Sequence, residues 1–295
     1  MKLSKIAAVG AVSVASSAWA GGKVPPGWME VADNRAQFAA TQGASGWTYL
    51  FDSGFGSLVH QMPYFTSGEG GVEGWATASV IGGSGSYCHI SMDSSGLSAM
   101  HPNAPNDCNL TAPGLQRPIL RWSGLLLGHA RIALQAEWFA PTGHDARLLL
   151  SANGQVLLDR TLAETLGAPI DFAADVTDLQ AVELLEDPTA DGCHSDAVKF
   201  HLTILVPDCN SNLIPDSVEI ANGSVYDRNH DGVPDPCQCL ADVIENGVVD
   251  GADLAALLTV WGTTGGIYPR ADTNADGVVD GSDLATVLGG WGACP

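Results

Sequence analysis

The chain has 295 residues, of which 33 are acidic and 12 are Lys or Arg, so its formal net charge at pH 7 is −21. A protein this acidic repels the phosphates of nucleic acid, so nucleic acid is excluded as an expected partner and divalent cations are favoured. The 88 residues from Asp208 onward hold 14 acidic and two basic residues, and such a segment must be neutralised or remain expanded.

The first residues have the organisation of a secretory signal peptide. Lys2 and Lys5 precede an apolar stretch over residues 6–17, and Ala18-Trp19-Ala20 supplies a small-x-small cleavage site. The alternative is a membrane anchor, but the stretch is shorter than the roughly 18 residues that a spanning helix needs. The sequence therefore predicts a signal peptide over residues 1–20, a mature protein that begins at Gly21, no membrane span, and secretion to the cell exterior or surface.

Seven cysteines in an exported chain indicate disulfides, and the odd number leaves at least one thiol or an intermolecular bond. Within the first domain the closest plausible pair is Cys88 with Cys108. Cys237 and Cys239 are not spaced as a CxxC redox site, and we expect them to form structural disulfides. The sequence does not define the connectivity of the cysteines, which stand at positions 88, 108, 193, 209, 237, 239 and 294.

Residues 24–206 contain short apolar runs separated by Gly, Asn, Asp and Pro, without a long 3.6-residue period, which is typical of an all-β domain. The clearest element is a hairpin over residues 147–159, whose Asn153-Gly154 dipeptide suits the positive φ angles of a type I′ turn. About 180 residues suffice for one β-sandwich with its own core. Further strands are expected at residues 118–122, 130–139, 170–174, 181–185 and 198–206.

Several short motifs of this domain resemble a jelly-roll module of secreted planctomycete-type proteins. They are Thr41-Gln42-Gly43 with Trp47-Thr48-Tyr49, Arg121-Trp122, and Ser195-Asp196-Ala197. Similar galactose-binding-like sandwiches often bind glycans, so the resemblance implies a polysaccharide or a cell-surface ligand. Aromatic faces stack on sugar rings, although most tryptophans in a domain of this size are core residues. The candidate aromatic residues are Trp47, Tyr49, Tyr64, Trp75 and Tyr87.

Residues 207–239 contain one nine-residue pattern twice, nineteen residues apart. Oxygen-bearing side chains at alternate positions converge on one cation when the backbone curls. The shared D-x-N-x-(N/D)-x-(I/V)-P-D pattern is similar to thrombospondin type 3 calcium repeats, and the resemblance implies a calcium-binding connector; the alternative is a plain polar linker. The expected ligands are Asp208, Asn210, Asn212 and Asp216 in the first copy, and Asp227, Asn229, Asp231 and Asp235 in the second.

Residues 240–295 contain another repeat, offset by thirty residues. The twelve-residue loop 272–283 has oxygens at positions 1, 3, 5, 7, 9 and 12 and Gly277 at position 6. The loop 242–253 has Ile244 at position 3, so we expect it to bind calcium more weakly. The expected ligands are Asp272, Asn274, Asp276, the Val278 carbonyl, Asp280 and Asp283 in one loop, and Asp242, Asn246, the Val248 carbonyl, Asp250 and Asp253 in the other.

After each loop, four large apolar residues recur at i, i+3, i+4 and i+7, which gives a helix one apolar face. They are Leu254, Leu257, Leu258 and Trp261, and then Leu284, Val287, Leu288 and Trp291. We expect the two helices to pack as a pseudo-twofold pair, with the tryptophans in the core. This arrangement strongly resembles a type I dockerin, in which loop positions 10 and 11 contact a cohesin. Gly251-Ala252 and Gly281-Ser282 hold those positions here, so a cohesin-like or cell-surface partner is implied for residues 240–295.

The sequence contains no HExxH, GxSxG or glycine-rich phosphate motif, so no catalytic residue is predicted. We expect Glu183, Glu186 and Asp187 to be solvated acids, and His144-Asp145 and His194 near Asp196 to lie on the surface. The chain is thus predicted to be mainly β and non-catalytic. It comprises a jelly-roll β-sandwich (24–206), a calcium-repeat connector (207–239) and a small α-helical dockerin-like domain (240–295). The alternatives are a glycan-active hydrolase or lyase and a purely structural surface protein.

Overall fold

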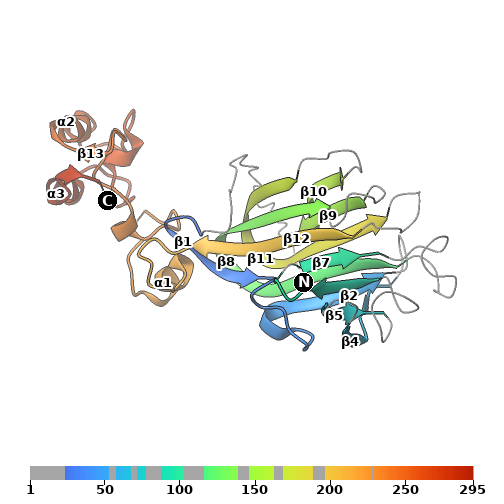
Figure 1. Ribbon diagram of the computed structural model, residues 1–295. Coiled ribbons are helices and arrows are strands. Elements are labelled where there is room, and N and C mark those ends of the chain that lie inside the picture. The colour runs from blue at the N-terminus through green and yellow to red at the C-terminus, as the bar shows by residue number, and fades with distance from the viewer. Residues whose placement is uncertain are drawn as a thin grey trace, which may run out of the picture. The chain divides into compact units, whose positions relative to one another are not determined.

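The computed structural model describes residues 24–52, 58–67, 72–77, 88–96, 98–102, 116–138, 146–162, 169–188, 197–227 and 229–294. These residues fall into two compact units (Figure 1). One lies within Glu30–Leu205, and the other comprises Pro25–Met29 and Val206–Pro295. The predicted signal peptide lies outside the described residues. Among the residues that are described, no helix is both long and apolar enough to cross a membrane.

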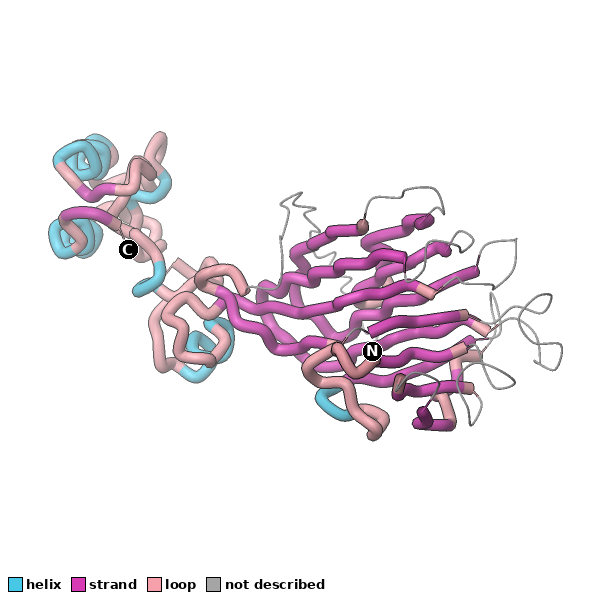
Figure 2. The backbone as a smooth tube through the Cα atoms, in the orientation of Figure 1, coloured by secondary structure: helices cyan, strands magenta, loops and turns pink. Residues whose placement is uncertain are grey.

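The first unit is built of strands, which Figure 2 shows in magenta. The sheet order is β10-β9-β11-β8-β12-β7-β6-β5-β4, with β1 beside β12 and β2 between β3 and β8. The described registers of this sheet are all antiparallel. The strands are β1 (Trp28–Asp33), β2 (Trp47–Asp52), β3 (His60–Gln61), β4 (Tyr64–Ser67), β5 (Glu73–Ala76), β6 (His89–Met92), β7 (Ser98–His101), β8 (Arg117–Trp138), β9 (Ala146–Ala152), β10 (Gln155–Leu162), β11 (Ile170–Pro188) and β12 (Val198–Pro207); a short 3-10 turn, η1 (Ala44–Gly46), precedes β2.

Two long strands, β8 and β11, make the arrangement sandwich-like. The beginning of β8 pairs with β2, whereas its end pairs with β12. Between these parts the register of β11 against β8 shifts twice, on either side of Leu179. The carboxylate of Asp178 accepts a 2.9 Å hydrogen bond from the N–H of Gly128 at this bend. Bulges bend and twist strands, so a single strand can serve two layers.

The mainly β, sandwich-like prediction is confirmed, but its strand boundaries need correction. The segments predicted at residues 118–122 and 130–139 belong to the one strand β8, although residue 139 is outside the described part. Those predicted at 170–174 and 181–185 both belong to β11. The intervening residues of β8 include exposed Leu125 and Leu127. Backbone pairing carries the strand through this stretch without a buried apolar pattern.

The predicted hairpin is confirmed. Asn153 and Gly154 have φ angles of 50° and 79°, and Gln155 lies opposite Ala152. The Asn153 Oδ1 also accepts a 2.8 Å hydrogen bond from the N–H of Gln180, which ties the turn to β11. The short side-chain oxygen of Asn makes the left-handed conformation accessible there.

The second unit is made of loops and short helices. Its elements are α1 (Asp216–Asn222), η3 (Asp235–Cys237), β13 (Val248–Val249), α2 (Gly251–Thr259), η4 (Pro269–Ala271), α3 (Gly281–Gly289) and β14 (Gly292–Ala293). Asp250 and Asp280 cap α2 and α3 in reciprocal capping boxes with the acid three residues later. These caps fix where each helix begins.

The segment after each helix pairs with the loop before the other helix. Val249 lies opposite Gly292 in the β13–β14 ladder. In the matching place, the Gly262 N–H donates to the Val279 carbonyl and the Val279 N–H donates to the Thr263 carbonyl, both at 2.8 Å. Each copy therefore pairs with the other in the same way, so the two copies are related by a pseudo-twofold symmetry.

The prediction that Trp261 and Trp291 belong to the core is wrong. They are 45% and 53% exposed, and the leucines three residues earlier are also exposed. Both tryptophans lie beyond the ends of their helices, since α2 ends at Thr259 and α3 at Gly289, whereas Leu258 and Leu288 lie within the helices on a side that the core does not cover. The residue at i+7 therefore does not continue the helical face. The core consists instead of smaller residues from both copies, among them Val243, Val249, Ala256, Leu257, Val279 and Val287.

Candidate metal centre

Backbone hydrogen bonds curl the first half of loop 272–283 around its acidic side chains. The Asp272 carboxylate accepts from the N–H groups of Asp276 at 3.1 Å and Gly277 at 2.9 Å. The Asn274 Oδ1 accepts from the Asp276 N–H at 3.0 Å. Gly277 has a φ of 92°, in the left-handed region that favours glycine. This geometry brings positions 1, 3 and 5 to one side of the turn.

The helix cap closes the same loop. Asp283 at position 12 is fully buried and accepts from the N–H groups of Thr273 and Asp280, each at 2.8 Å. Asp280 at position 9 in turn caps α3 by accepting from the Ser282 N–H at 2.8 Å. The ligand expected at position 12, Asp283, is thus hydrogen-bonded to Thr273, which directly follows the ligand expected at position 1.

Loop 242–253 is closed in a similar way, although position 3 lacks an oxygen and the N–H that reaches the twelfth residue comes from position 3 rather than position 2. Asp242 accepts from the N–H groups of Asn246 at 3.0 Å and Gly247 at 2.7 Å. Asp253 accepts from the N–H groups of Ile244 at 3.1 Å and Asp250 at 2.9 Å. Ile244 therefore takes part through its backbone only. The loop keeps its shape and has one oxygen fewer.

The first connector copy is a complete twelve-residue loop, 208–219. Asp208 accepts from the N–H groups of Asn212 at 3.1 Å and Leu213 at 2.9 Å. Glu219, on α1, occupies position 12 and is 5% exposed. Its carboxylate accepts from the side-chain amides of Asn210 at 3.0 Å and Asn212 at 2.7 Å. Sequence analysis missed Glu219, although it follows Asp208 at the same interval that separates Asp272 from Asp283.

Three acids lie close together in this loop: Asp208, Asp216 and Glu219 are all buried. Burial raises the pKa of Asp216, and the neighbouring charges of Asp208 and Glu219 raise it further, while a hydrogen bond from the Cys209 N–H acts in the opposite direction. A bound cation would remove this repulsion.

The second connector copy, loop 227–238, has an amide at position 12. Asp227 accepts from the N–H groups of Asp231 at 3.2 Å and Gly232 at 3.0 Å. The Gln238 side-chain nitrogen donates to an Asp231 carboxylate oxygen at 2.7 Å and to the Val233 carbonyl at 2.9 Å. A cation here requires the Gln238 amide to turn its oxygen inward. This loop has the poorest fit of the four.

The donor chemistry of these loops fits a hard cation. Calcium takes six to eight oxygens from carboxylates, amides and carbonyls, and the loops offer these groups. A carboxylate oxygen that accepts one N–H retains a lone pair for a metal. Loops 208–219 and 272–283 supply oxygens at all six positions, loop 242–253 at five, and loop 227–238 at six with a neutral last group.

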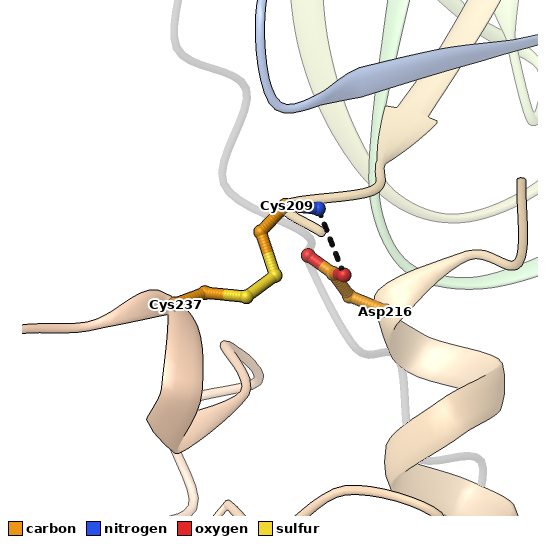
Figure 3. A group of neighbouring side chains, drawn as sticks. All are labelled: Cys209, Asp216 and Cys237. Atoms are coloured by element: carbon orange, nitrogen blue, oxygen red, sulfur yellow. Dashed lines mark hydrogen bonds between the residues drawn. A yellow bond between two sulfur atoms is a disulfide. The ribbon is translucent and has the colours of Figure 1, made fainter. Parts of the chain in front are cut away.

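Two disulfides lie at these loops, and the prediction that Cys237 and Cys239 are disulfide cysteines is confirmed. Cys209 bonds to Cys237, and Cys239 to Cys294. Figure 3 shows the first bond beside α1, with the Cys209 N–H donating to Asp216 at 3.1 Å. Cys88 is buried, while Cys108, the partner expected for it, and Cys193 lie outside the described residues.

The acids expected to be solvated on the sandwich are partly buried. Glu183 pairs with Arg121. Glu186 is fully buried, and Asp187 contacts buried Arg117 at 3.0 Å. Arg117 also binds Asp52 through two hydrogen bonds of 2.8 and 2.7 Å. The expectation is wrong for Glu186 and Asp187, which the sheet buries, whereas the Glu183 side chain remains 36% exposed. His144, Asp145, His194 and Asp196 fall outside the described residues.

Most of the candidate sugar-stacking residues are core residues. Trp47, Tyr49 and Trp75 are buried, and the rings of Tyr49 and Trp75 stack with centroids 5.8 Å apart. Tyr64 on β4 is 46% exposed. Tyr87 lies outside the described residues. Of the described candidates, Tyr64 alone is exposed.

No family model matches the sequence, and no curated protein matches it. Among solved structures, the CBM51-2 and INT domains of Clostridium perfringens ZmpB match 95% of this chain and 43% of that chain, with 8% identity and a TM-score of 0.28. The same domains in complex with GlcNAc match over 90% and 54%, with 10% identity and a TM-score of 0.29. A Paenibacillus sp. cycloisomaltooligosaccharide glucanotransferase matches over 52% and 18%, with 12% identity and a TM-score of 0.22. The chain thus spans about half the length of the ZmpB structures, and TM-scores this low establish neither a common fold nor a ligand.

Proposed function

We propose that this chain is a secreted, non-catalytic, calcium-binding modular protein. One observation carries the proposal: in all four loops the N–H at position 6 donates to the carboxylate at position 1. The pairs are Leu213 with Asp208 at 2.9 Å, Gly232 with Asp227 at 3.0 Å, Gly247 with Asp242 at 2.7 Å, and Gly277 with Asp272 at 2.9 Å. This bond closes the turn that follows the oxygens at positions 1, 3 and 5, and a sharp turn at position 6 is a requirement for a calcium loop.

Calcium, when bound, supplies positive charge that offsets the carboxylates and joins the two ends of each loop. The residues that would hold it are those expected from the sequence, together with Glu219 and Gln238 at the twelfth positions of the connector loops. Asp283 and Asp253 are already held by two N–H groups each. Such preorganisation lowers the entropy lost on binding.

The second part of the proposal is a docking role for residues 240–295, like that of a dockerin, with a cohesin-like or cell-surface partner. Gly251-Ala252 and Gly281-Ser282, at loop positions 10 and 11, are exposed on the first turn of each helix. Small exposed residues allow close approach of a partner surface, and the exposed Trp261 and Trp291 offer aromatic contact area.

The third part is that the sandwich binds a polysaccharide or a cell-surface component. Tyr64 is the described aromatic residue available for stacking. A glycan-array screen of the full chain should show binding that Tyr64→Ala weakens and that His60→Ala, on the neighbouring exposed strand, leaves unchanged. Degradation of a polysaccharide in the same screen would instead support the enzymatic alternative.

The test of the calcium proposal is isothermal titration of the full chain after removal of divalent ions. We expect saturable calcium binding at more than two sites, with magnesium binding much more weakly. Absence of heat and of any spectral change up to millimolar calcium would overturn it.

A further inference from the structure

The two disulfides are placed on three of the four loops. Cys209 is position 2 of loop 208–219 and Cys237 is position 11 of loop 227–238, so this bond joins those loops across a sequence separation of 28. Cys239 precedes loop 242–253 by three residues, and its bond to Cys294 spans a separation of 55. The first disulfide therefore joins residues within two of the proposed calcium loops, and the second is attached three residues before a third loop.

The second disulfide lies directly against loop 242–253. The Cys294 Sγ is 3.6 Å from the Asp242 Oδ2, and the Cys294 N–H donates to the Gly247 carbonyl at 3.1 Å. These are positions 1 and 6, the two residues whose hydrogen bond folds the loop. Loop 242–253 is also the one that lacks an oxygen at position 3.

Loop 272–283 has no such support. The pseudo-twofold relation, with its offset of thirty residues, places Thr264 where Cys294 stands and Pro269 where Cys239 stands. The pairing of Gly262 and Thr263 with Val279 is made by the backbone alone. Loop 272–283 therefore serves as an internal comparison: it lies in the same unit and contains no cysteine, although Cys239 and Cys294 pack against the core that includes its Val279.

We propose that the disulfides and calcium form a redox-sensitive device in which reduction by a dithiol weakens calcium binding at loops 208–219, 227–238 and 242–253 more than at loop 272–283. In each event the S–S bond breaks, the cysteine sulfurs take up two electrons and two protons to become thiols, and the dithiol closes to its own disulfide. The inference rests on the proposed calcium function. Closing chain segments of these lengths removes much of the disorder of the metal-free loops, so losing the bonds raises the entropy that calcium must offset.

Linkage makes the effect reciprocal. If reduction weakens calcium binding by a certain factor, calcium makes the disulfide harder to reduce by the same factor. We expect this factor to be about tenfold, within the range usual for coupled sites. Calcium should thus limit the extent to which a given dithiol reduces both disulfides at equilibrium.

The test uses the full chain labelled with ¹⁵N and titrated with calcium, before and after treatment with dithiothreitol. The amides of Leu213, Gly232, Gly247 and Gly277 report on the four loops, since each donates to a position-1 carboxylate. After reduction the first three should require about tenfold more calcium, and Gly277 should change much less. The double variant Cys239→Ser with Cys294→Ser should shift Gly247 most and leave Leu213 and Gly232 unchanged, which separates the two disulfides.

A second readout follows the cysteines instead of the metal. Alkylation and mass spectrometry should show that calcium protects Cys239–Cys294 and Cys209–Cys237 from a fixed dithiol concentration. If each loop keeps its calcium affinity after reduction and calcium does not protect the disulfides, the inference is overturned while the calcium proposal stands. A shift of Gly277 equal to that of Gly247 would also overturn it. No calcium response of any of the four amides in the oxidised chain would overturn the calcium proposal itself.

Discussion

The twelfth residue of each loop decides how much negative charge faces the cation. Glu219 is a buried carboxylate held by two Asn amides, whereas Gln238 at the equivalent place is a neutral amide that donates to Asp231. Ligand charge sets calcium affinity in loops of this kind. Glu219→Gln should therefore lower the affinity of loop 208–219, and Gln238→Glu should raise that of loop 227–238, each by about tenfold or roughly 1.4 kcal/mol. Calcium titration followed at the Leu213 and Gly232 amides tests both, and opposite or absent shifts would contradict the assignment of position 12.

The missing oxygen at Ile244 predicts that the two C-terminal loops differ in affinity. Asp272→Ala removes a carboxylate that also accepts the Gly277 N–H, so it should abolish the tighter binding event of the pair. Asp242→Ala should abolish the weaker one and leave the tighter one in place. Titration of each variant gives the answer, and two equal events in the wild-type protein would show that a position-3 side chain is unimportant here.

At the scale of the element, the tight turn in each loop depends on backbone conformation rather than on space. Gly277 has a φ of 92°, and no atom lies within 4 Å of where a Cβ would stand. Gly277→Ala should therefore destabilise the calcium-bound loop by about 1–2 kcal/mol through backbone strain alone. Gly289→Ala is the matched control, because Gly289 also has open space but a helical backbone. Alanine there should be neutral or stabilising. Thermal unfolding in saturating calcium measures both, and equal effects would contradict the strain argument.

Elements whose signals are local could be predicted from the sequence. The Asn153-Gly154 turn needs only adjacent residues, and it is present in the structure. The packing of Trp261 and Trp291 could not be predicted, because helical periodicity assumes a helix that continues beyond its ninth residue. Strand lengths failed for a related reason, since the exposed middle of β8 is held by pairing with β11.

The spacing of the ligands in the candidate site could be predicted from the sequence, but the set of predicted ligands was incomplete. The alternating oxygens after Asp208 predicted the loop, but the nine-residue pattern ends before Glu219, which lies on the helix that follows. Charge pairs between distant strands had no local signal. Arg117 meets Asp52 and Asp187 across sequence separations of 65 and 70, and nothing in the neighbourhood of any one of them indicates that contact.

At the scale of the whole molecule, the two units should respond differently to calcium. The sandwich buries many apolar side chains, among them Leu120, Leu134, Leu148 and Phe200. The second unit has short helices and buried acids such as Asp208, Asp253 and Asp283. Helices of nine residues are marginal without tertiary support, and like charges brought together oppose folding. Calcium binding therefore becomes folding free energy for this unit alone.

The corresponding prediction is that chelation unfolds residues 206–294 and leaves the sandwich folded. Stabilisation by calcium grows as RT ln(1 + [L]/Kd), which is about 2.7 kcal/mol at one hundred times Kd. In the full chain, a chelator should abolish the helical circular dichroism and the exchange protection of Leu257 and Val287, while the amides of Leu134 and Leu202 in β8 and β12 stay protected. Magnesium in place of calcium is the control and should restore little. Helices that stay protected in chelator would show that the small core around Val249 and Val279 suffices, and loss of protection in β8 would show that the sandwich depends on the metal as well.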